Sequence, residues 1–283
     1  MGELLIKPPI SAKEFAFSTA DFQVIRQRLK QIAGINLAES KDSMVYSRLS
    51  RRIRKLGLAS FEDYLRLLDI NNEETEFFVN ALTTNLTSFF REPHHFEILK
   101  DYLSKHTGPL VIWCAGCSSG EEAYSVAISC AEARGSFDHN VKIYASDIDS
   151  GVLSIAQKGI YQQKAISDLS LDYKKAFFLK GKGNKADSVK LNPKIVGSVH
   201  FFKQNLFDSD WKITDKVDVI FCRNVMIYFD KPTQDALVER FTKILKPNGL
   251  YMAGHSENFA RLSQYLKPLG QTAYTKQQAY PDA

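Results

Sequence analysis

Two loops in the sequence carry glycines and acidic side chains in a pattern typical of a ligand site. The segment CAGCSSGEE, from Cys114 to Glu122, follows a short apolar run, and Asp147 follows a second one. Glycines let a backbone approach a ligand closely, and a carboxylate at a strand end can accept hydrogen bonds from both hydroxyls of a ribose. These residues therefore predict a site for a ligand that contains a nucleoside.

The charge of the first loop distinguishes between two kinds of nucleoside ligand. A dinucleotide enzyme would carry G-x-G-x-x-G, because pyrophosphate needs exposed backbone N–H groups and a positive helix N-terminus. Here Gly116 and Gly120 are followed by Glu121 and Glu122, which would repel pyrophosphate. S-adenosylmethionine carries a sulfonium and an ammonium but no phosphate, so the pattern favours it over NAD. The alternatives are that Asp147 only caps the next helix and that the glutamates only favour the helix dipole.

The elements that must position these loops alternate between strands and helices. Short apolar runs predict strands over residues 109–114, 141–146, 199–202, 217–222 and 250–253, and helical patterns cover residues 121–133, the segment from about 149, and 233–245. Strands that alternate with helices are typical of a parallel sheet with both faces covered. The Lys-rich stretch over residues 160–197 does not fit this order, so we expect it to be an inserted antiparallel β-subdomain.

The first ninety residues show helical spacing instead. We expect helices over residues 18–34, 42–56, 60–68 and 73–82; Ser18 with Asp21 starts the first as a capping box, and Gly34 and Gly57 end two of them. The chain is thus predicted to consist of an all-helical domain, residues 1–90, and an α/β domain, residues 91–283.

Composition narrows the class of protein. The chain has 283 residues, of which 44% are hydrophobic, enough for a substantial core. No apolar run reaches the roughly 20 residues of a membrane span, and the N-terminus does not look like a secretory signal, so we expect a cytoplasmic protein. Cys114 and Cys117 form a CxxC pair, but Cys130 and Cys222 offer no second paired spacing for a zinc site, so no metal is predicted.

Basic residues are concentrated in two segments. Residues 26–55 hold nine Lys/Arg against two Asp/Glu, and residues 158–203 hold ten against three, although the net charge of the whole chain is only +5. Such segments indicate an acidic partner, which the charge alone leaves open as nucleic acid or protein.

Four segments resemble the chemotaxis receptor methyltransferase family, CheR. They are NLTSFFRE over residues 85–92, WCAGCSSGEEAYS over 113–125, SDID over 146–149 and FCRNVMIYFD over 221–230, and the resemblance extends from about Ser18 to Tyr274. It implies an N-terminal all-helical domain, a Rossmann-like S-adenosylmethionine-dependent methyltransferase domain and a small inserted antiparallel β-subdomain. It also implies methyl transfer to glutamates on the cytoplasmic helical region of bacterial chemoreceptors, and recruitment to membrane-bound receptor arrays. The first loop departs slightly from the family pattern in its small residues.

The resemblance implies a set of functional residues. The cofactor contacts are Asn85, Thr87, Arg91, Gly116, Glu122, Asp147, Asn205, Leu206, Asn224 and Val225, with Asn205 and Leu206 on the adenine side. Tyr228 is expected near the position of methyl transfer. Arg91 is expected to hold a carboxylate of either the substrate or the cofactor. An ionised glutamate, whose usual pKa is about 4.3, needs no general base. We therefore expect His94 and His95 to be surface or packing residues.

The basic segments are the predicted receptor-facing surfaces. The first presents Arg48, Arg51, Arg52, Arg54 and Lys55 on one helix, where mutual repulsion would be relieved by acidic receptor helices. The alternatives are an ordinary solvated helix face, or anchoring of a receptor C-terminal tail by the Lys-rich insertion. We expect a monomer.

Two other functions fit the sequence less well. A nucleic-acid methyltransferase that modifies base amino groups would carry an Asn/Asp-Pro-Pro-aromatic box, where this chain reads Arg223-Asn-Val-Met. A non-catalytic module that senses S-adenosylmethionine or docks on receptors is the other alternative, and intact Arg91, Asp147 and Tyr228 argue against lost activity. We therefore expect that the protein does not bind nucleic acid and does not insert a segment into a membrane.

Overall fold

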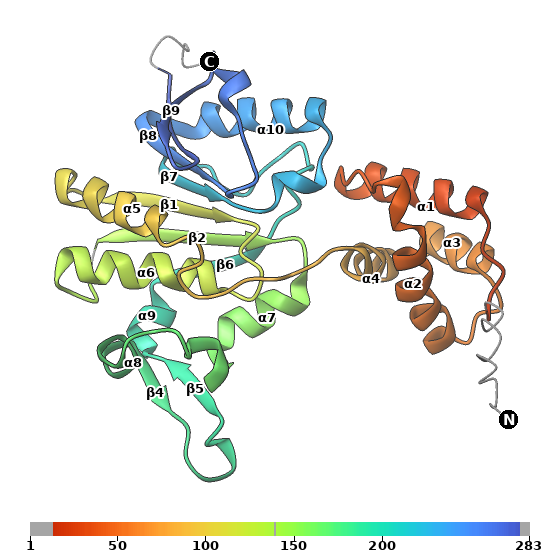
Figure 1. Ribbon diagram of the computed structural model, residues 1–283, viewed down its shortest axis with the longest axis horizontal. Helices are drawn as coiled ribbons and strands as arrows, with labels where there is room; N and C mark the ends of the chain where they lie inside the picture. The colour runs from red at the N-terminus through yellow and green to blue at the C-terminus, as the bar shows by residue number, and fades with distance from the viewer. Residues whose placement is uncertain (1–13, 139, 278–283) are drawn as a thin grey trace, which may run out of the picture. The chain divides into compact units, whose positions relative to one another are not determined.

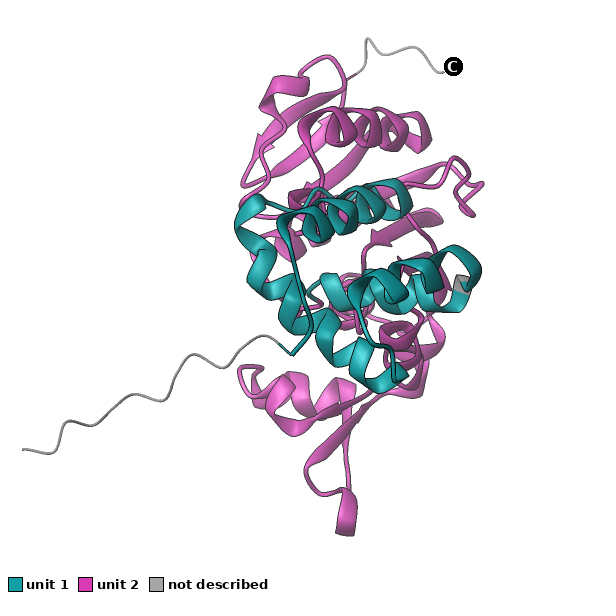
Figure 2. Cartoon of the chain, turned by 90° about the vertical axis from the view of Figure 1, so that its right-hand side faces the viewer, with its two compact units in different colours: residues 1–84 teal, residues 85–283 magenta. Residues whose placement is uncertain are grey.

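The computed structural model describes residues 14–138 and 140–277, and the chain divides into two compact units, Met1–Thr84 and Asn85–Ala283 (Figure 2). Residues 1–13, where no secretory signal is expected, lie outside the described residues. No described helix is both long enough and apolar enough to cross a membrane.

The boundary between the units lies earlier than the expected position after residue 90. The side-chain amide of Asn85 donates to Asp149 at 3.0 Å, and the Phe90 N–H donates to the Ser125 hydroxyl at 2.9 Å. Because these partners belong to the α/β unit, the segment from Asn85 onward folds with that unit.

The first unit is all-helical, as the sequence predicts. Its helices are α1 (Thr19–Ala33), α2 (Asp42–Leu56), α3 (Phe61–Ile70) and α4 (Asn72–Leu82), with a 3₁₀ turn, η1 (Glu39–Lys41), before α2. Ser18 and Asp21 form the expected capping box, and Gly34 and Gly57 end α1 and α2 in the left-handed conformation. Apolar residues on one stripe of each helix form the core, among them Ile25, Leu29, Val45, Leu49, Ile53 and Phe78.

The second unit is built on a seven-stranded sheet in the order β6-β2-β1-β7-β8-β10-β9 (Figure 1). The strands are β1 (Leu110–Ala115), β2 (Val141–Asp147), β6 (Val199–Lys203), β7 (Val217–Cys222), β8 (Leu245–Ala253), β9 (Leu266–Gly270) and β10 (Ala273–Lys276). The first five are parallel to one another, whereas β10 is antiparallel to both β8 and β9. The Rossmann-like fold predicted from the sequence is thus confirmed, with an antiparallel edge that the sequence does not predict.

The main helices of the second unit are α5 (His94–Lys105), α6 (Glu121–Arg134), α7 (Ser150–Lys158) and α10 (Lys231–Ile244). Ile112 and Cys114 of β1 share a core with Tyr124 of α6, whereas the ring of Trp113 lies 5.4 Å from that of Phe241 in α10. Because successive side chains of a strand point to opposite faces, α6 covers one face of the sheet and α10 the other.

The Lys-rich insertion forms a separate three-stranded antiparallel sheet, as expected (Figure 1). Its order is β3-β5-β4, with β3 (Ile160–Gln162), β4 (Phe178–Lys180) and β5 (Ser188–Leu191). Short helices complete it: η2 (Gln163–Ile166), α8 (Leu171–Phe177), η3 (Gly183–Lys185) and α9 (Pro193–Gly197). The insertion therefore joins α7 to β6 without interrupting the main sheet.

Candidate functional site

The candidate site lies where the direction of strand order reverses. From β1 the chain continues to β2 and then β6 on one side of the sheet, and later strands β7 and β8 lie on the other side of β1. The reversal between β1 and β7 is a topological switch point, where ligands of open α/β sheets bind at the carboxyl ends of the strands. The loops that begin at Gly116, Gln204 and Arg223, and Asp147 at the end of β2, all belong to this edge.

Gly116 lets the loops after β1 and β7 approach each other. Its φ is 85°, and a Cβ atom at this position would lie 2.3 Å from Cγ2 of Val225. Any other residue would therefore displace the Val225 side chain and be strained at this positive φ. The structure thus brings together two residues, Gly116 and Val225, that the family resemblance assigns to the cofactor site.

Asp147 holds the loop after β1 in place. Its Oδ2 accepts the Ser118 N–H at 2.8 Å, and its Oδ1 accepts the Asp149 N–H at 3.0 Å. Asp147 does not cap α7: that role belongs to Asp149, whose Oδ1 accepts the Gly151 N–H. The cap alternative is therefore wrong for Asp147. Burial raises the pKa of its carboxyl, and hydrogen bonds from backbone N–H groups lower it.

Glu122 lies in the first turn of α6, with its side chain 12% exposed and its Oε1 atom buried. Its Oε2 lies 3.2 Å from Nη1 of Arg223, but its Oε1 has no hydrogen-bond partner among the described residues. Burial raises the pKa of Glu122 to about 7, against the opposing effect of Arg223. The neighbouring Glu121 behaves differently, because its carboxylate accepts a hydrogen bond from the Ser119 hydroxyl at 2.7 Å. Of the two glutamates, Glu122 is the one that leaves a buried acceptor open for a cationic group.

Arg223 joins Glu122 to the segment before α5, and sequence reasoning missed this role. Its side chain is 2% exposed; Nη2 lies 3.3 Å from Oε2 of Glu92 and donates to the carbonyl oxygen of Arg91. One buried guanidinium thus links three parts of the chain. The only available signal was its place directly after a strand, within the FCRN motif.

The segment from Asn85 to Glu92 is shaped by hydrogen bonds and by unusual backbone angles. The Asn85 carbonyl accepts from the Ser118 hydroxyl at 3.1 Å, and the Arg91 guanidinium donates to the Leu86 carbonyl at 3.0 Å. Phe90 and Glu92 have positive φ values of 52° and 56°. Non-glycine residues rarely adopt this region, and such strain concentrates at functional sites. Thr87, also predicted as a contact, is half-buried in this segment.

The loop after β6 carries the residues expected on the adenine side. Oδ1 of Asn205 accepts the Phe207 N–H at 3.0 Å, and the Leu206 carbonyl accepts from Trp211 and Arg240, each at 3.1 Å. The side chain of Leu206 is buried, whereas Asn205 is half-buried. These bonds fix the backbone of the loop.

A buried carboxylate that the sequence did not reveal supports the loop after β7. Oε2 of Glu257 accepts the N–H groups of Asn224 and Gly254 at 3.0 and 2.6 Å, and Oε1 accepts the Ile227 N–H at 3.2 Å. Asn224 has a φ of 60°. The loop then enters η4 (Met226–Tyr228), in which Tyr228 is half-buried. Glu257 therefore fixes the backbone from which Asn224, a predicted contact, and Tyr228 project.

The open acceptor on Glu122 fits a cofactor that carries a cation. Three buried or half-buried carboxylates, of Glu92, Glu122 and Glu257, act electrostatically on this region, against the buried guanidinium of Arg223 and the half-buried one of Arg91. Such an acidic environment is compatible with the ammonium of S-adenosylmethionine and unfavourable for pyrophosphate. The donor set therefore agrees with the cofactor expected from the sequence.

Cys114, Cys117 and His95 are buried. Burial raises the pKa of both thiols well above the usual value, which disfavours the thiolate form that binds metals. Burial also lowers the pKa of His95 to about 4. Its ring Nε2 lies 2.9 Å from the Gln271 carbonyl oxygen, which places it in the packed interior.

The basic residues of α2 lie in the first unit and differ in exposure. Arg52 forms two hydrogen bonds with the buried Glu74, at 2.8 and 2.5 Å, and Arg48 donates to the carbonyls of Ala81 and Thr83 at 3.1 and 2.7 Å. The mutual repulsion expected among these residues is thus partly relieved within the chain, by Glu74 at Arg52. Arg54 pairs with Glu14 at the surface, and Arg51 and Lys55 are exposed.

Comparison with known proteins gives two successive family matches. Residues 20–83 match the model described as "CheR methyltransferase, all-alpha domain", and residues 85–275 match the model described as "CheR methyltransferase, SAM binding domain". The two matched ranges meet at the boundary between the compact units.

Similar curated proteins span nearly the whole chain. "Chemotaxis protein methyltransferase 2" of Pseudomonas aeruginosa is 50% identical over 272 residues, covering 95% of this chain and 97% of that protein. "Chemotaxis protein methyltransferase" of Salmonella typhimurium is 45% identical, covering 93% and 92%. The Escherichia coli protein of the same name is 43% identical with the same coverage of both chains, 93% and 92%.

Proposed function

The chain belongs to the CheR methyltransferase family, and we propose that it transfers a methyl group from S-adenosylmethionine to glutamate side chains of bacterial chemoreceptors. The products are a glutamate methyl ester and S-adenosylhomocysteine. Relatives that are named chemotaxis protein methyltransferases support the receptor as substrate.

The observation that carries the proposal is the open, buried Oε1 acceptor of Glu122. A buried carboxylate oxygen without a partner is costly, and a cationic ligand group would remove this cost. Asp147, at the end of the neighbouring strand β2, offers acceptors for a ribose. The pair therefore supports binding of the amino-acid part and the nucleoside part of one molecule at adjacent strand ends.

When bound, S-adenosylmethionine supplies a methyl carbon made electrophilic by the adjacent sulfonium. The remaining task of the protein is to align the reacting atoms, which can lower a barrier by several kcal/mol. A receptor glutamate is ionised near neutral pH and can attack without a base. The low pKa of about 4 for buried His95 agrees with a mechanism in which no histidine takes a proton.

Arg91 and Tyr228 are the residues that we assign to the reacting groups. The guanidinium of Arg91, half-buried and held by the Leu86 carbonyl, can orient a carboxylate through two parallel hydrogen bonds. Tyr228 can donate a hydrogen bond or present its ring face to a cation. Glu257 supports this role because its carboxylate fixes the backbone of the loop that leads into Tyr228.

We further propose that the receptor docks on the exposed basic residues of α2, Arg51, Arg54 and Lys55. Arg48 and Arg52 contribute indirectly, because their hydrogen bonds hold α2 against α4. The β-subdomain, with its lysines, is the alternative anchor for a receptor tail.

The decisive experiment uses the whole protein, labelled S-adenosylmethionine and membranes rich in chemoreceptors. We expect label on the receptor that is released by mild base, because esters are base-labile whereas N-methyl groups are not. Replacing the receptor's acceptor glutamates with alanine should abolish labelling. Base-stable label, or label that appears in added nucleic acid instead of the receptor, would refute the proposal.

A further inference from the structure

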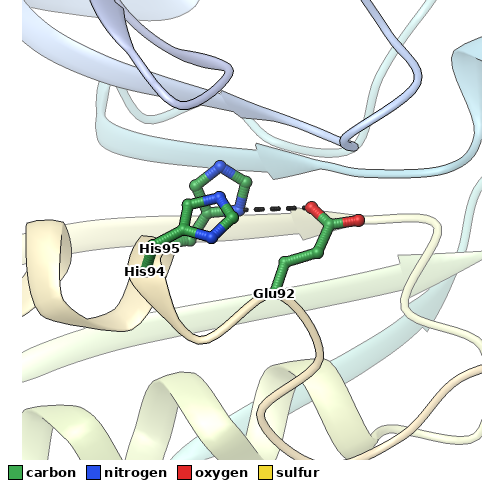
Figure 3. A group of neighbouring side chains, drawn as sticks. All are labelled: Glu92, His94 and His95. Atoms are coloured by element: carbon green, nitrogen blue, oxygen red, sulfur yellow. Dashed lines mark ion pairs between the residues drawn. The ribbon is translucent and has the colours of Figure 1, made fainter.

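Three side chains at the start of α5 direct potential metal ligands toward one another. One ligand atom each from Glu92, His94 and His95 lies within 4.8 Å of the other two (Figure 3). The contributing atoms include Oε2 of Glu92 and Nδ1 of His95, which are 3.6 Å apart. Oε2 of Glu92, Nε2 of His94 and Nδ1 of His95 are all buried and make no hydrogen bond with a described residue.

The protonation of His95 is fixed by its other ring nitrogen. Nε2 of His95 lies 2.9 Å from the carbonyl oxygen of Gln271, which can only accept a hydrogen bond. The Thr272 hydroxyl, 3.2 Å from Nε2, can either donate or accept, so the Gln271 carbonyl assigns the hydrogen to Nε2, and in the neutral ring Nδ1 is left with a lone pair. A hydrogen bond from the remote nitrogen to a backbone carbonyl is also the usual support of a histidine that binds a metal.

Two acceptors consequently face each other across the cluster. The lone pair of His95 Nδ1 points to a carboxylate oxygen of Glu92, while the ring of His94 packs against that of His95 with centroids 4.2 Å apart. His95 is completely buried, with 0% exposed area, so bulk water does not screen this opposition. Either a proton or a cation between the atoms would convert the repulsion into an attraction.

Charges of both signs surround the cluster: besides burial, the guanidinium of Arg223 lowers the pKa of His95, whereas the carboxylate of Glu92 raises it. Glu92 Oε2 also lies 3.3 Å from Arg223, but the same guanidinium is shared with Glu122 at 3.2 Å. Glu257 adds a further carboxylate to the electrostatic environment of Glu122. Arg223 would remain paired with Glu122 if Glu92 turned toward a metal ion.

We propose that Glu92, His94 and His95 form a binding site for one Zn²⁺ ion. Two imidazoles and a carboxylate are a donor set that zinc accepts, with a fourth position open to water. Tetrahedral bonds of about 2.0–2.2 Å put ligand atoms about 3.3–3.5 Å apart, close to the 3.6 Å between His95 and Glu92. The other separations, up to 4.8 Å, require only side-chain rotation of His94 or Glu92. The zinc site adjoins the proposed cofactor site, because Glu92 and Glu122 share the guanidinium of Arg223, but zinc binding is measured without cofactor or receptor.

Zinc titration of the chelator-treated, full-length protein tests the proposal. We expect one Zn²⁺ per chain in competition with a chromophoric chelator, and a higher unfolding temperature with zinc because the ion binds only the folded chain. Co²⁺ in the same site should give the visible absorption of a four-coordinate ion. No binding up to millimolar zinc would overturn the proposal.

Variants assign the binding to these residues. Glu92→Gln and His94→Ala should each weaken zinc binding at least tenfold, and both leave the buried His95 in place. His200→Ala, which alters an exposed histidine on β6, is the matched control and should bind zinc normally. Equal affinity in Glu92→Gln, His94→Ala and the control would overturn the assignment. Nitrogen NMR provides a second test. If His95 carries a hydrogen on both ring nitrogens and its spectrum does not change with zinc, a proton occupies the place of the metal and the proposal is overturned.

Discussion

Arg223 and Glu122 form a buried ion pair across the candidate site, with Nη1 and Oε2 3.2 Å apart and side chains only 2% and 12% exposed. The pair connects the end of β7 to the first turn of α6. It satisfies one carboxylate oxygen of Glu122 and leaves the other without a hydrogen-bond partner among the described residues. Glu122 is thus held in place by one cation, and we propose that its second oxygen binds the ammonium of the cofactor.

This arrangement predicts that cofactor affinity depends on pH. Because burial raises the pKa of Glu122 to about 7, a growing fraction of the carboxyl is neutral below that pH and cannot attract an ammonium. We expect wild-type affinity for S-adenosylmethionine to fall about tenfold from pH 8 to about pH 6, since one unit below a pKa roughly one-tenth of the group is ionised. Titration calorimetry measures this. Glu122→Gln should bind weakly with a nearly flat profile; parallel profiles for both proteins would contradict the prediction.

The raised pKa of Glu122 makes the stability of the folded protein depend on pH in the opposite direction to cofactor affinity. The pKa of Glu122 is raised in the folded state, so the folded protein holds a proton that the unfolded chain releases. The contribution to stability is therefore fully present below about pH 4.5 and is lost as the pH rises through about 7. Denaturant unfolding between these limits should show a smaller loss of stability in Glu122→Gln than in the wild type. Cofactor must be absent, since binding would mask the effect.

Asp147→Ala should reduce both cofactor affinity and stability. The carboxylate accepts the N–H groups of Ser118 and Asp149 and is proposed to accept the ribose hydroxyls. Hydrogen bonds to charged groups contribute about 1.5–3 kcal/mol each. Asp149→Ala, which removes the cap of α7, should cost about 0.5–2 kcal/mol of stability with a smaller effect on affinity. If Asp147→Ala binds the cofactor as tightly as Asp149→Ala does, Asp147 has only a structural role.

Arg91→Lys should lose most turnover although the charge is kept, because an ammonium cannot form two parallel hydrogen bonds with a carboxylate. Steady-state kinetics with receptor membranes measure it. The matched control is Arg134→Lys, because Arg134 also donates to a backbone carbonyl, that of His106, and lies at the end of α6. Near-normal turnover of Arg91→Lys would remove this residue from the reaction.

Elements with local signals were predictable from the sequence. Ser18 marks the start of α1 through its side chain, and Gly57 marks the end of α2 through the freedom of its backbone. The apolar run predicted as a strand over residues 217–222 coincides with β7. The antiparallel edge was not predictable, because four of the five residues of β9 are exposed and no alternating pattern arises. Helix α5 lacked a start signal, since Pro93 precedes it without a capping side chain.

The site was predictable only where its residues follow strands within a motif, as Glu122 and Asp147 do. Arg223 pairs with Glu92 and Glu122, which are distant in the sequence and meet only in the fold. Glu257 binds backbone N–H groups that any residue type would supply, so no sequence pattern marks it. Buried networks of this kind depend on tertiary structure rather than on local spacing.

The basic helix α2 illustrates the same difficulty. Arg51 and Arg52 are adjacent and equally basic, yet Arg52 and the 3% exposed Glu74 form a nearly buried pair, whereas Arg51 is exposed. Removing one partner of a buried pair typically costs about 3–5 kcal/mol. We expect Arg52→Met to approach the lower end of this range, because the arginine remains partly exposed, and Arg51→Met to change stability by less than about 0.5 kcal/mol. Thermal and denaturant unfolding compare them; equal effects would contradict the distinction.

Receptor recognition should depend on the exposed charges of α2 rather than on its buried pair. We expect Arg51→Glu combined with Lys55→Glu to lose receptor methylation while keeping cofactor affinity, because both residues are exposed on the first unit. Arg54 is a less suitable target, since it already pairs with Glu14. Lys105→Glu combined with Lys267→Glu changes the net charge equally at exposed lysines of the second unit and serves as the control.

Salt and receptor length separate helix docking from tail anchoring. If α2 docks the receptor, wild-type methylation should fall as salt rises, because exposed charges are screened beyond about 8–10 Å at physiological ionic strength, and the loss should lie mainly in the association rate. The α2 double variant should then be impaired even with a receptor fragment that lacks its C-terminal tail. Reversing Lys180 and Lys190 of the β-subdomain should impair methylation only when the tail is present, because those residues lie on the paired strands β4 and β5. Normal methylation by the α2 variant at both low and high salt would leave its basic residues as an ordinary solvated surface.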